Sequence, residues 1–428
     1  MQLATTDPGG DEQNLSLTQS RAEIDAVNAQ FYGRYPFPPR AYRLEGLLDP
    51  DFQRIFVCQD VGDWKHRSIP PRPAIWVAGC GTNQALITAL AYPNANVVGS
   101  DISAPSLDLA ARGMRDLSIG NLELRHESLN AVQYQEAFDY IVCTGVIHHN
   151  SHPATALQCI ARALKPNGIL ELMVYNRYQR IPSSCFQKAL RILADGQCAG
   201  SDERELHMAE AMVNGFEAPG HMGTFLRGLR GAQREELADS LLQPVEHSYT
   251  VSGLDELARH CGLEILLPVV NMYDKLKDNI SWELPLPDAK LQQAYWKLDD
   301  VQRWQVTNLL LGECCPLLWF YFRRERTVRL SEREICDLFL DTCFTRTATL
   351  KQAYHLGDDG SYRLVPGSIK FPPPLRGRFG TVADAADGQT CMREILGRQG
   401  ISTAFPEANK IRARLTTTAF PYLKAVAE

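Results

Sequence analysis

A glycine turn between an apolar strand and an apolar helix constrains this chain more than any other stretch. Residues 74–90 read AIWVAGCGTNQALITAL, and the turn falls at Gly79, Cys80 and Gly81. Glycine has no Cβ, so the backbone can bend tightly there and approach a ligand. The first turn of the following helix offers N–H groups that have no intrahelical partner. The stretch therefore predicts a ligand cradle at the carboxyl end of a strand.

A carboxylate follows the cradle at the end of a second predicted strand. Residues 96–101 read NVVGSD and end in Asp101. In doubly wound α/β folds an acid at this place hydrogen-bonds the hydroxyls of an adenosine ribose. The dinucleotide fingerprint has a third glycine where this chain has Gln84. We therefore expect an adenosine cofactor without a diphosphate.

The turn resembles the first motif of the class I S-adenosylmethionine-dependent methyltransferases, which commonly reads Gly-Cys-Gly-Thr-Gly. Gly79 to Thr82 match this motif, and Asn83 stands in place of its last glycine. Val77 stands where many members carry an acid that helps to hold the methionine ammonium. The resemblance implies S-adenosylmethionine as the cofactor. The two departures leave open a cofactor-binding scaffold or regulator without catalysis.

A second stretch with the same resemblance lies at residues 138–149, FDYIVCTGVIHH. Its apolar run is typical of a central parallel strand buried on both faces. A helix over 153–164, a Lys-Pro-Asn-Gly turn and a strand over 169–175 are expected next. The order of elements over 74–176 is similar to that of the family. The resemblance implies an α/β fold, a doubly wound seven-stranded Rossmann-like sheet.

The resemblance also assigns roles to residues at the strand ends. Asp101 would hold the ribose, and Ser128 with Leu129 the adenine, with Glu127 as a rival to Ser128. The glycine turn and Thr144-Gly145 would hold the methionine portion. The aromatic and proline-rich segment 31–40 is either a lid or a packing strap. The expected cofactor-binding residues are Tyr32, Tyr35, Gly79, Cys80, Gly81, Asn83, Asp101, Ile102, Ser128, Leu129, Thr144, Gly145 and Val146.

Histidines at the end of the second signature are the candidate catalytic residues. His148 and His149 follow the strand directly, and an imidazole near the transferred methyl can accept a proton from an oxygen or nitrogen nucleophile. The alternative is that a histidine here only lines the pocket. Pro153 keeps His148 and His152 off a common helix, and the HExxH glutamate is absent, so we expect no metal.

The chain divides by composition and predicted elements into four parts. Two segments, 177–247 and 271–313, are expected as insertions into the cofactor domain, over the carboxyl ends of its strands. Their aromatic residues either build an apolar acceptor pocket or form a small core of their own. Those aromatics are Trp282, Tyr295, Trp296 and Trp304. The parts are a disordered 1–18, a helical lid segment 19–73, the cofactor domain 74–325 with insertions 177–247 and 271–313, and an accessory α+β module 326–428.

The module over 326–428 has three predicted features. A helix is expected over 331–342, a hairpin about the Asp-Asp-Gly turn within 353–365, and a helix at 391–396. The module can recognise a peptide or carrier, form a homodimer or cap the substrate site.

Composition narrows the function further. A net charge of −6 gives no general attraction to nucleic acid, and no Asn-Pro-Pro-Tyr motif follows the fourth strand. No apolar run reaches membrane-spanning length, and twelve cysteines without a CxxC pair indicate free thiols in the cytoplasm. We expect methyl transfer to an oxygen or nitrogen of a small, apolar or aromatic specialised metabolite. The alternative enzyme acts on a peptide or carrier-bound substrate.

Overall fold

The computed structural model describes residues 21–194, 203–217, 219–270, 282–315, 317–325 and 329–426. The predicted disorder of residues 1–18 and the start of the second insertion, residues 271–281, lie outside the described residues. Among the described residues, no helix combines the length and apolar character needed to cross a lipid bilayer.

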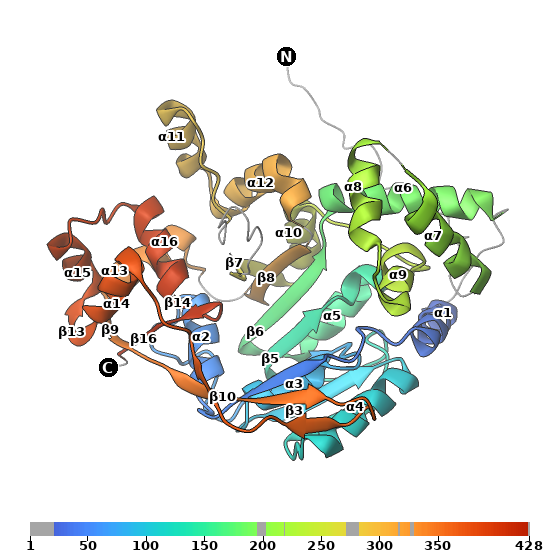
Figure 1. Cartoon of the computed structure of the whole chain (residues 1–428). Helices are drawn as coiled ribbons and strands as arrows, with labels where there is room; N and C mark the ends of the chain where they lie inside the picture. Colours follow the sequence, from blue (N-terminus) through green and yellow to red (C-terminus); the bar gives the residue numbers. More distant parts are fainter. Residues whose placement is uncertain are drawn as a thin grey trace.

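A seven-stranded mixed sheet organises the fold, as the sequence predicted (Figure 1). Neighbouring strands pair in parallel except β8, which runs antiparallel to both β6 and β7. The carboxyl ends of β2, β3, β4 and β5 therefore meet at one edge. In spatial order the strands are β4 (Leu122–His126), β3 (Asn96–Asp101), β2 (Ala74–Ala78), β5 (Phe138–Thr144), β6 (Leu164–Tyr175), β8 (Leu317–Arg324) and β7 (Leu263–Pro268).

Helices of the cofactor domain follow the strands in the order that the sequence predicted. Ser103 caps one of them, because its side chain accepts a hydrogen bond from the Ser106 N–H. Thr250 caps another in the same way, because its side chain accepts a hydrogen bond from the Gly253 N–H. These helices are α3 (Gln84–Ala91), α4 (Ala104–Asp116), α5 (Pro153–Ala163) and α10 (Val251–His260).

The first insertion forms a helical group beside the N-terminal helix α1 (Arg21–Arg34) (Figure 1). Phe31 and Tyr35 of the N-terminal segment share a buried apolar cluster with this group, including Phe186 and Leu226. Pro182 lies inside α6 and does not end this helix, although proline usually disfavours a helix interior. The helices are α6 (Arg177–Leu193), α7 (Glu203–Gly215), α8 (Gly220–Leu229) and α9 (Arg234–Leu241).

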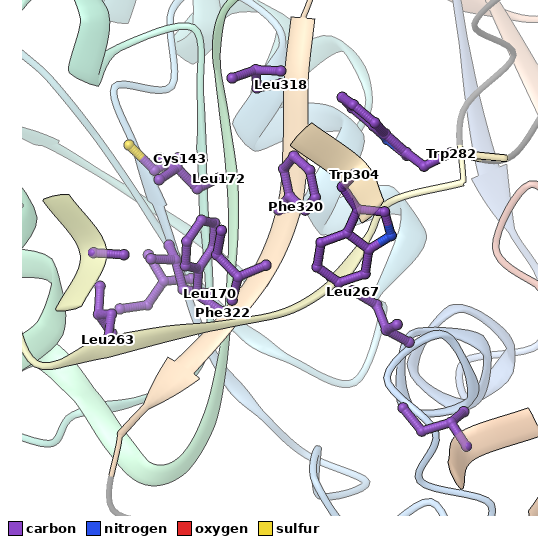
Figure 2. Close-up of a cluster of buried hydrophobic side chains, with 14 of the residues drawn as sticks. Cys143, Leu170, Leu172, Leu263, Leu267, Trp282, Trp304, Leu318, Phe320 and Phe322 are labelled. Carbon is purple, nitrogen blue, oxygen red and sulfur yellow. The ribbon is translucent and has the colours of Figure 1, made fainter. Parts of the chain in front are cut away.

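Two tryptophans from the described residues of the second insertion pack onto the large sheet. Trp282 and Trp304 lie against Phe320 of β8, at ring-centroid distances of 5.2 Å and 5.6 Å (Figure 2). Trp296 contacts Phe405 near the C-terminus at 5.3 Å. Trp282 and Trp304 therefore belong to the main apolar core and Trp296 packs against it, so these side chains do not form a small core of the insertion's own. The insertion's elements are α11 (Ala289–Lys297), α12 (Asp300–Leu311) and the short 3₁₀ helix η2 (Gly312–Cys314).

A second sheet joins the N-terminal segment to the C-terminal residues. Strand β1 (Arg43–Leu47) pairs antiparallel with β10 (Thr349–Leu356), and β10 pairs with β11 (Tyr362–Leu364) in the expected hairpin. Residues expected in an accessory module thus complete a sheet with residues expected in the lid segment. The remaining strand of this sheet is β12 (Ile369–Phe371), which pairs with β10. Helix α2 (Phe52–Asp60) packs against the sheet in a small apolar cluster.

The remaining C-terminal elements share the main core. Phe339, Leu396 and Phe405 belong to the same buried apolar cluster as Leu172 and Phe320 of the large sheet. The helices at 331–342 and 391–396 are present close to their predicted positions. The elements are α13 (Glu332–Asp341), β9 (Cys343–Arg346), α14 (Gly377–Asp384), β13 (Asp387–Cys391), α15 (Met392–Arg398), α16 (Phe405–Leu415), β14 (Thr416–Thr417), β15 (Phe420–Pro421) and β16 (Leu423–Ala425).

Candidate active site

A cavity of about 320 Å³ opens at the carboxyl ends of β2, β3, β4 and β5. Helix α1 and the residues Phe37 and Pro38 complete its wall. Of the residues expected in the site, only Tyr35 and His148 are outside this wall. The expected residues that line the cavity are Tyr32, Gly79, Cys80, Gly81, Asn83, Asp101, Ile102, Ser128, Leu129, Thr144, Gly145, Val146 and His149.

The glycine turn is shaped by close backbone approach. Gly79 and Gly81 have φ values of +71° and +52°, which side chains rarely adopt. A Cβ on Gly79 would lie 2.3 Å from a methyl of Val146, and one on Gly81 would lie 2.5 Å from the Phe37 carbonyl oxygen. Only glycine lets the turn sit between the β5 loop and the N-terminal segment.

Asp101 is held at the floor of the cavity by backbone groups. Its carboxylate accepts hydrogen bonds from the N–H of Gly81 and the N–H of Ser103, both at 2.8 Å. Burial raises the pKa of the Asp101 carboxyl, and these two hydrogen bonds oppose the rise. The acid predicted from the sequence thus lies directly beside the glycine turn.

The two departures of the turn from the common motif have different outcomes. The Asn83 side chain donates to the Pro39 carbonyl at 2.8 Å and accepts from the Ala41 N–H at 3.2 Å. The Thr82 hydroxyl donates to the Pro38 carbonyl at 2.5 Å. Asn83 therefore ties the proline-rich segment to the turn. Val77 is buried in β2, so no carboxylate reaches the cavity from this position.

One face of α1 supplies Tyr32, which the sequence analysis assigned to the site, and two residues that it did not assign, Asp25 and Asn28. Asp25, Asn28 and Tyr32 have the spacing of a single helix face, and all three line the cavity. The Asp25 carboxylate accepts hydrogen bonds from the Ser128 hydroxyl and from Asn130 Nδ2, the latter at 2.9 Å. Attention to polar as well as apolar residues at helical spacing would have found this face.

His149 lies at the end of the cavity nearest β5 and is held in one orientation. Its Nδ1 lies 3.0 Å from the Val245 carbonyl oxygen, which can only accept, so Nδ1 carries the proton and Nε2 keeps its lone pair. Burial lowers the pKa of the His149 imidazole, and the negative charges of Asp239 and Glu246 partly oppose this shift. The ring is therefore neutral at pH 7.

His148 has a different environment. It is fully buried outside the cavity wall, its ring centroid lies 3.8 Å from that of Tyr175, and neither ring nitrogen has a hydrogen-bond partner among the described residues. Burial lowers its pKa well below the ordinary value. A side chain that neither lines the cavity nor bonds a group in it cannot exchange a proton with a ligand there, so the assignment of His148 as a base is wrong.

The first insertion reaches the site through a buried carboxylate. Asp239 of α9 accepts hydrogen bonds from the hydroxyls of Tyr32 at 3.1 Å and Tyr175 at 3.2 Å. Gln243 Nε2 also donates to the Tyr32 hydroxyl. The hydroxyl of Tyr32 is thus hydrogen-bonded to two residues of the first insertion. Tyr35, the other expected tyrosine, packs in the apolar cluster of the insertion.

The C-terminal hairpin supports the segment that covers the glycine turn. The Tyr362 hydroxyl donates to the Ala41 carbonyl at 2.9 Å, and the Arg40 guanidinium donates to the Gly360 carbonyl. The Arg40 guanidinium also lies 4.8 Å from the centroid of the Tyr362 ring. The C-terminal residues therefore act on the cavity indirectly, through residues 39–41.

Comparison with known proteins agrees with this arrangement. Residues 76–170 match a family model described as a methyltransferase domain. An uncharacterized protein of a Synechococcus strain is 29% identical over 312 residues, which cover 70% of this chain and 71% of that protein. The Ubiquinone biosynthesis O-methyltransferase of Paracidovorax citrulli is 30% identical over 101 residues, which are 23% of this chain and 42% of that enzyme.

Solved structures show the same fold over most of the chain. PKMT2 from Rickettsia typhi superposes with a TM-score of 0.56 at 15% sequence identity, covering 91% of this chain and 76% of that one. The same protein in complex with AdoHcy gives a TM-score of 0.56 and covers 88% of this chain and 72% of that one. The likeness thus extends beyond the large sheet.

Proposed function

Because this chain contains a class I S-adenosylmethionine-dependent methyltransferase domain, we propose that it methylates an oxygen or nitrogen of a small molecule that binds beside His149. One observation carries this proposal. A single cavity runs from the glycine turn and Asp101 to the neutral imidazole of His149. The residues proposed to hold the cofactor and the imidazole proposed to accept a proton thus line one cavity.

The residues of the cavity fit the proposed cofactor. Gly79 and Gly81 line the cavity with backbone and no side chain, and Asp101 offers carboxylate oxygens for ribose hydroxyls. Ser128 and Leu129 would lie against the adenine, and Thr144 with Gly145 against the methionine portion. When bound, S-adenosylmethionine supplies a methyl carbon that its sulfonium makes electrophilic.

His149 would accept the proton that the acceptor loses. Its Nδ1–H is engaged by Val245, so Nε2 is the nitrogen left to receive a proton. The lowered pKa keeps Nε2 unprotonated in neutral solution. Oxygen acceptors are also supported by the partial match to the Ubiquinone biosynthesis O-methyltransferase.

The wall of the cavity would keep water from the reacting groups. Tyr32, Phe37 and Pro38 cover it from the N-terminal side, and Met173 closes it from β6. A dry, fixed environment holds two reactants in position at a low entropic cost during the reaction. A cavity of about 320 Å³ suits a nucleoside cofactor and a compact acceptor group.

Methyl transfer from labelled S-adenosylmethionine tests the proposal. The full chain is incubated with labelled cofactor and either a small-molecule extract or a protein extract. We expect label in the small-molecule fraction. Label confined to protein would support the alternative of a peptide or carrier-bound substrate, and binding of S-adenosylhomocysteine without any transfer would support a scaffold.

Two histidine variants sharpen the test. His149→Asn keeps an N–H near the Val245 carbonyl but removes Nε2, and we expect kcat to fall by about 10²- to 10⁴-fold. His152 lies in the same loop, is exposed and is outside the cavity wall, so His152→Ala is the matched control and should keep full activity. Equal rates for both variants would remove His149 from the mechanism.

A further inference from the structure

Asn28 stands out in the cavity because half of its amide lacks a hydrogen-bond partner. The side chain is 5% exposed and lines the cavity. Its Nδ2 donates to the His149 carbonyl at 2.8 Å, while its Oδ1 has no partner among the described residues. A buried carbonyl oxygen without a donor costs about 1 to 3 kcal/mol, so such an atom beside a ligand cavity points to a ligand N–H or O–H.

The position of Asn28 along the cavity restricts which ligand group this is. Asp101 and Ser128 lie at the ends of β3 and β4, where the ribose and adenine would bind. The bond to the His149 carbonyl instead places Asn28 at the loop that follows β5. The group facing Oδ1 therefore belongs to the part of the ligand farthest from the adenine.

Charge points to the same group. The amino-acid portion of the cofactor carries an ammonium with three N–H donors. The position two residues before the first glycine is Val77, which is buried and cannot accept a hydrogen bond. Asp25, the acid on the same face of α1, is engaged by Ser128 and Asn130 at the other end of the cavity.

We propose that Asn28 Oδ1 binds the amino group of the cofactor's methionine portion, so that α1 supplies the contact that β2 lacks. This inference rests on the proposed function, because it requires S-adenosylmethionine in the cavity. It also gives helix α1, which forms part of the cavity wall, a role in selecting the cofactor. A nucleoside without the amino acid would leave Oδ1 unpaired.

Calorimetric binding of two ligands tests this role without any measurement of activity. S-adenosylhomocysteine carries the amino acid, and 5′-methylthioadenosine has the same nucleoside and thioether without it. For Asn28→Ala we expect affinity for S-adenosylhomocysteine to fall about 10- to 100-fold, as for loss of a hydrogen bond to a charged group. Affinity for 5′-methylthioadenosine should stay within about twofold.

Asn28→Asp is the second variant and guards against a general loss of folding. Its carboxylate can still accept from an ammonium, so S-adenosylhomocysteine should bind at least as tightly to Asn28→Asp as to Asn28→Ala, with the affinity for 5′-methylthioadenosine similar in both. Asp25→Ala is the matched control on the same helix face. It should change both affinities by the same factor, because Asp25 lies at the nucleoside end of the cavity.

The outcomes separate this inference from the proposed function. If the unmodified protein binds neither ligand, the proposed function is wrong and the inference falls with it. If the unmodified protein binds both but Asn28→Ala weakens them equally or not at all, the inference alone is wrong. A ratio of affinities that changes as much in Asp25→Ala as in Asn28→Ala would also contradict it, since the effect would then belong to α1 as a whole.

Discussion

The side-chain amide of Asn83 donates a hydrogen bond to the carbonyl oxygen of Pro39 at 2.8 Å. A residue of the cofactor turn thereby fixes the segment that covers the turn. The same side chain accepts from the Ala41 N–H, so a single amide fixes two points of the cover. Asn83, which stands in place of the common glycine, thus has a structural role of its own.

Replacing Asn83 by glycine should therefore loosen the segment of residues 39–41, which covers the glycine turn. Asn83→Gly loses both hydrogen bonds and adds backbone freedom, and we expect the free energy of unfolding to fall by about 1 to 3 kcal/mol. Amide hydrogen exchange should increase at residues 40–42, the first residues after the two prolines. Asn83→Asp keeps the acceptor for the Ala41 N–H, so its free energy of unfolding should lie between those of the parent and Asn83→Gly. Unchanged hydrogen exchange at these residues in Asn83→Gly would show that Asn83 does not hold the segment in place.

Removal of the Asp101 carboxylate should abolish tight cofactor binding while leaving the fold intact. Asp101→Asn keeps the shape of the side chain, and we expect affinity for S-adenosylhomocysteine to fall about 10- to 100-fold. Asparagine has one acceptor oxygen for the two N–H groups of Gly81 and Ser103, so the free energy of unfolding measured with urea should fall by about 1 to 3 kcal/mol without loss of the fold. Calorimetry measures the first quantity, and unaltered affinity would exclude Asp101 from the ribose site.

The pH profile should reflect the lowered pKa of His149. The imidazole must be unprotonated to accept a proton, so activity is lost as pH falls through its pKa. Because burial places that pKa below the ordinary value of about 6.5, kcat should stay near its maximum down to about pH 6.5. An acidic limb with its midpoint above that value would show that His149 is not the base or is not shielded.

Asp239 should couple the first insertion to Tyr32. In Asp239→Ala the hydroxyls of Tyr32 and Tyr175 lose their acceptor, and we expect a loss of about 2 to 4 kcal/mol in the free energy of unfolding. Tyr32→Phe removes one of the two hydroxyls. A double-mutant cycle between Asp239→Ala and Tyr32→Phe should give a coupling of about 1 kcal/mol, and strictly additive losses would mean that the contact contributes nothing.

Stability should also depend on pH through Asp60. Burial raises the pKa of this carboxyl to about 7, although it accepts hydrogen bonds from the hydroxyls of Tyr321 and Thr418. The folded state therefore holds a proton that the unfolded chain has already lost, so stability falls as pH rises from about 4 to about 7.

Asp60→Asn removes this titration. The free energy of unfolding at about pH 5 minus that at about pH 8, measured with urea, should be lower in the variant than in the parent by about 3 kcal/mol, because about two pH units lie between pH 5 and the pKa of about 7. His66 provides a comparison within the same protein. Burial lowers its pKa to about 4, so its contribution to stability falls as pH drops below about 6.5, the opposite direction. Equal pH differences in variant and parent would contradict the assignment to Asp60.

The cofactor half of the site could be predicted from sequence because its residues sit at the ends of consecutive parallel strands. Gly79, Asp101, Ser128 and Thr144 each lie at or just after the end of a strand of the sheet, and topology alone brings such positions together. The glycine spacing and the apolar run before Thr144 are local signals. They required no knowledge of how distant segments pack.

The remaining contacts depend on packing between segments that are far apart in the chain. Asp239 meets Tyr32 across 207 positions, and Val245 meets His149 across 96. No local pattern marks these pairs. The aromatic residues of the second insertion also could not be placed, because Trp304 suits a ligand pocket and a core equally well and only the fold puts it on Phe320.

The pairing of β1 with β10 has a consequence for how this protein is made. About 300 residues separate the two strands, so the ribosome releases β1 long before its partner exists. The glycine turn and its helix can form early, whereas the contacts of Arg40 and Ala41 with the hairpin must wait until Gly360 and Tyr362 have been synthesised. A nascent chain that stalls after β8 would thus have the glycine turn formed while segment 39–41 lacks its support from the hairpin. The edge of β1 that pairs with β10 would be unpaired, and such an edge can associate with other chains.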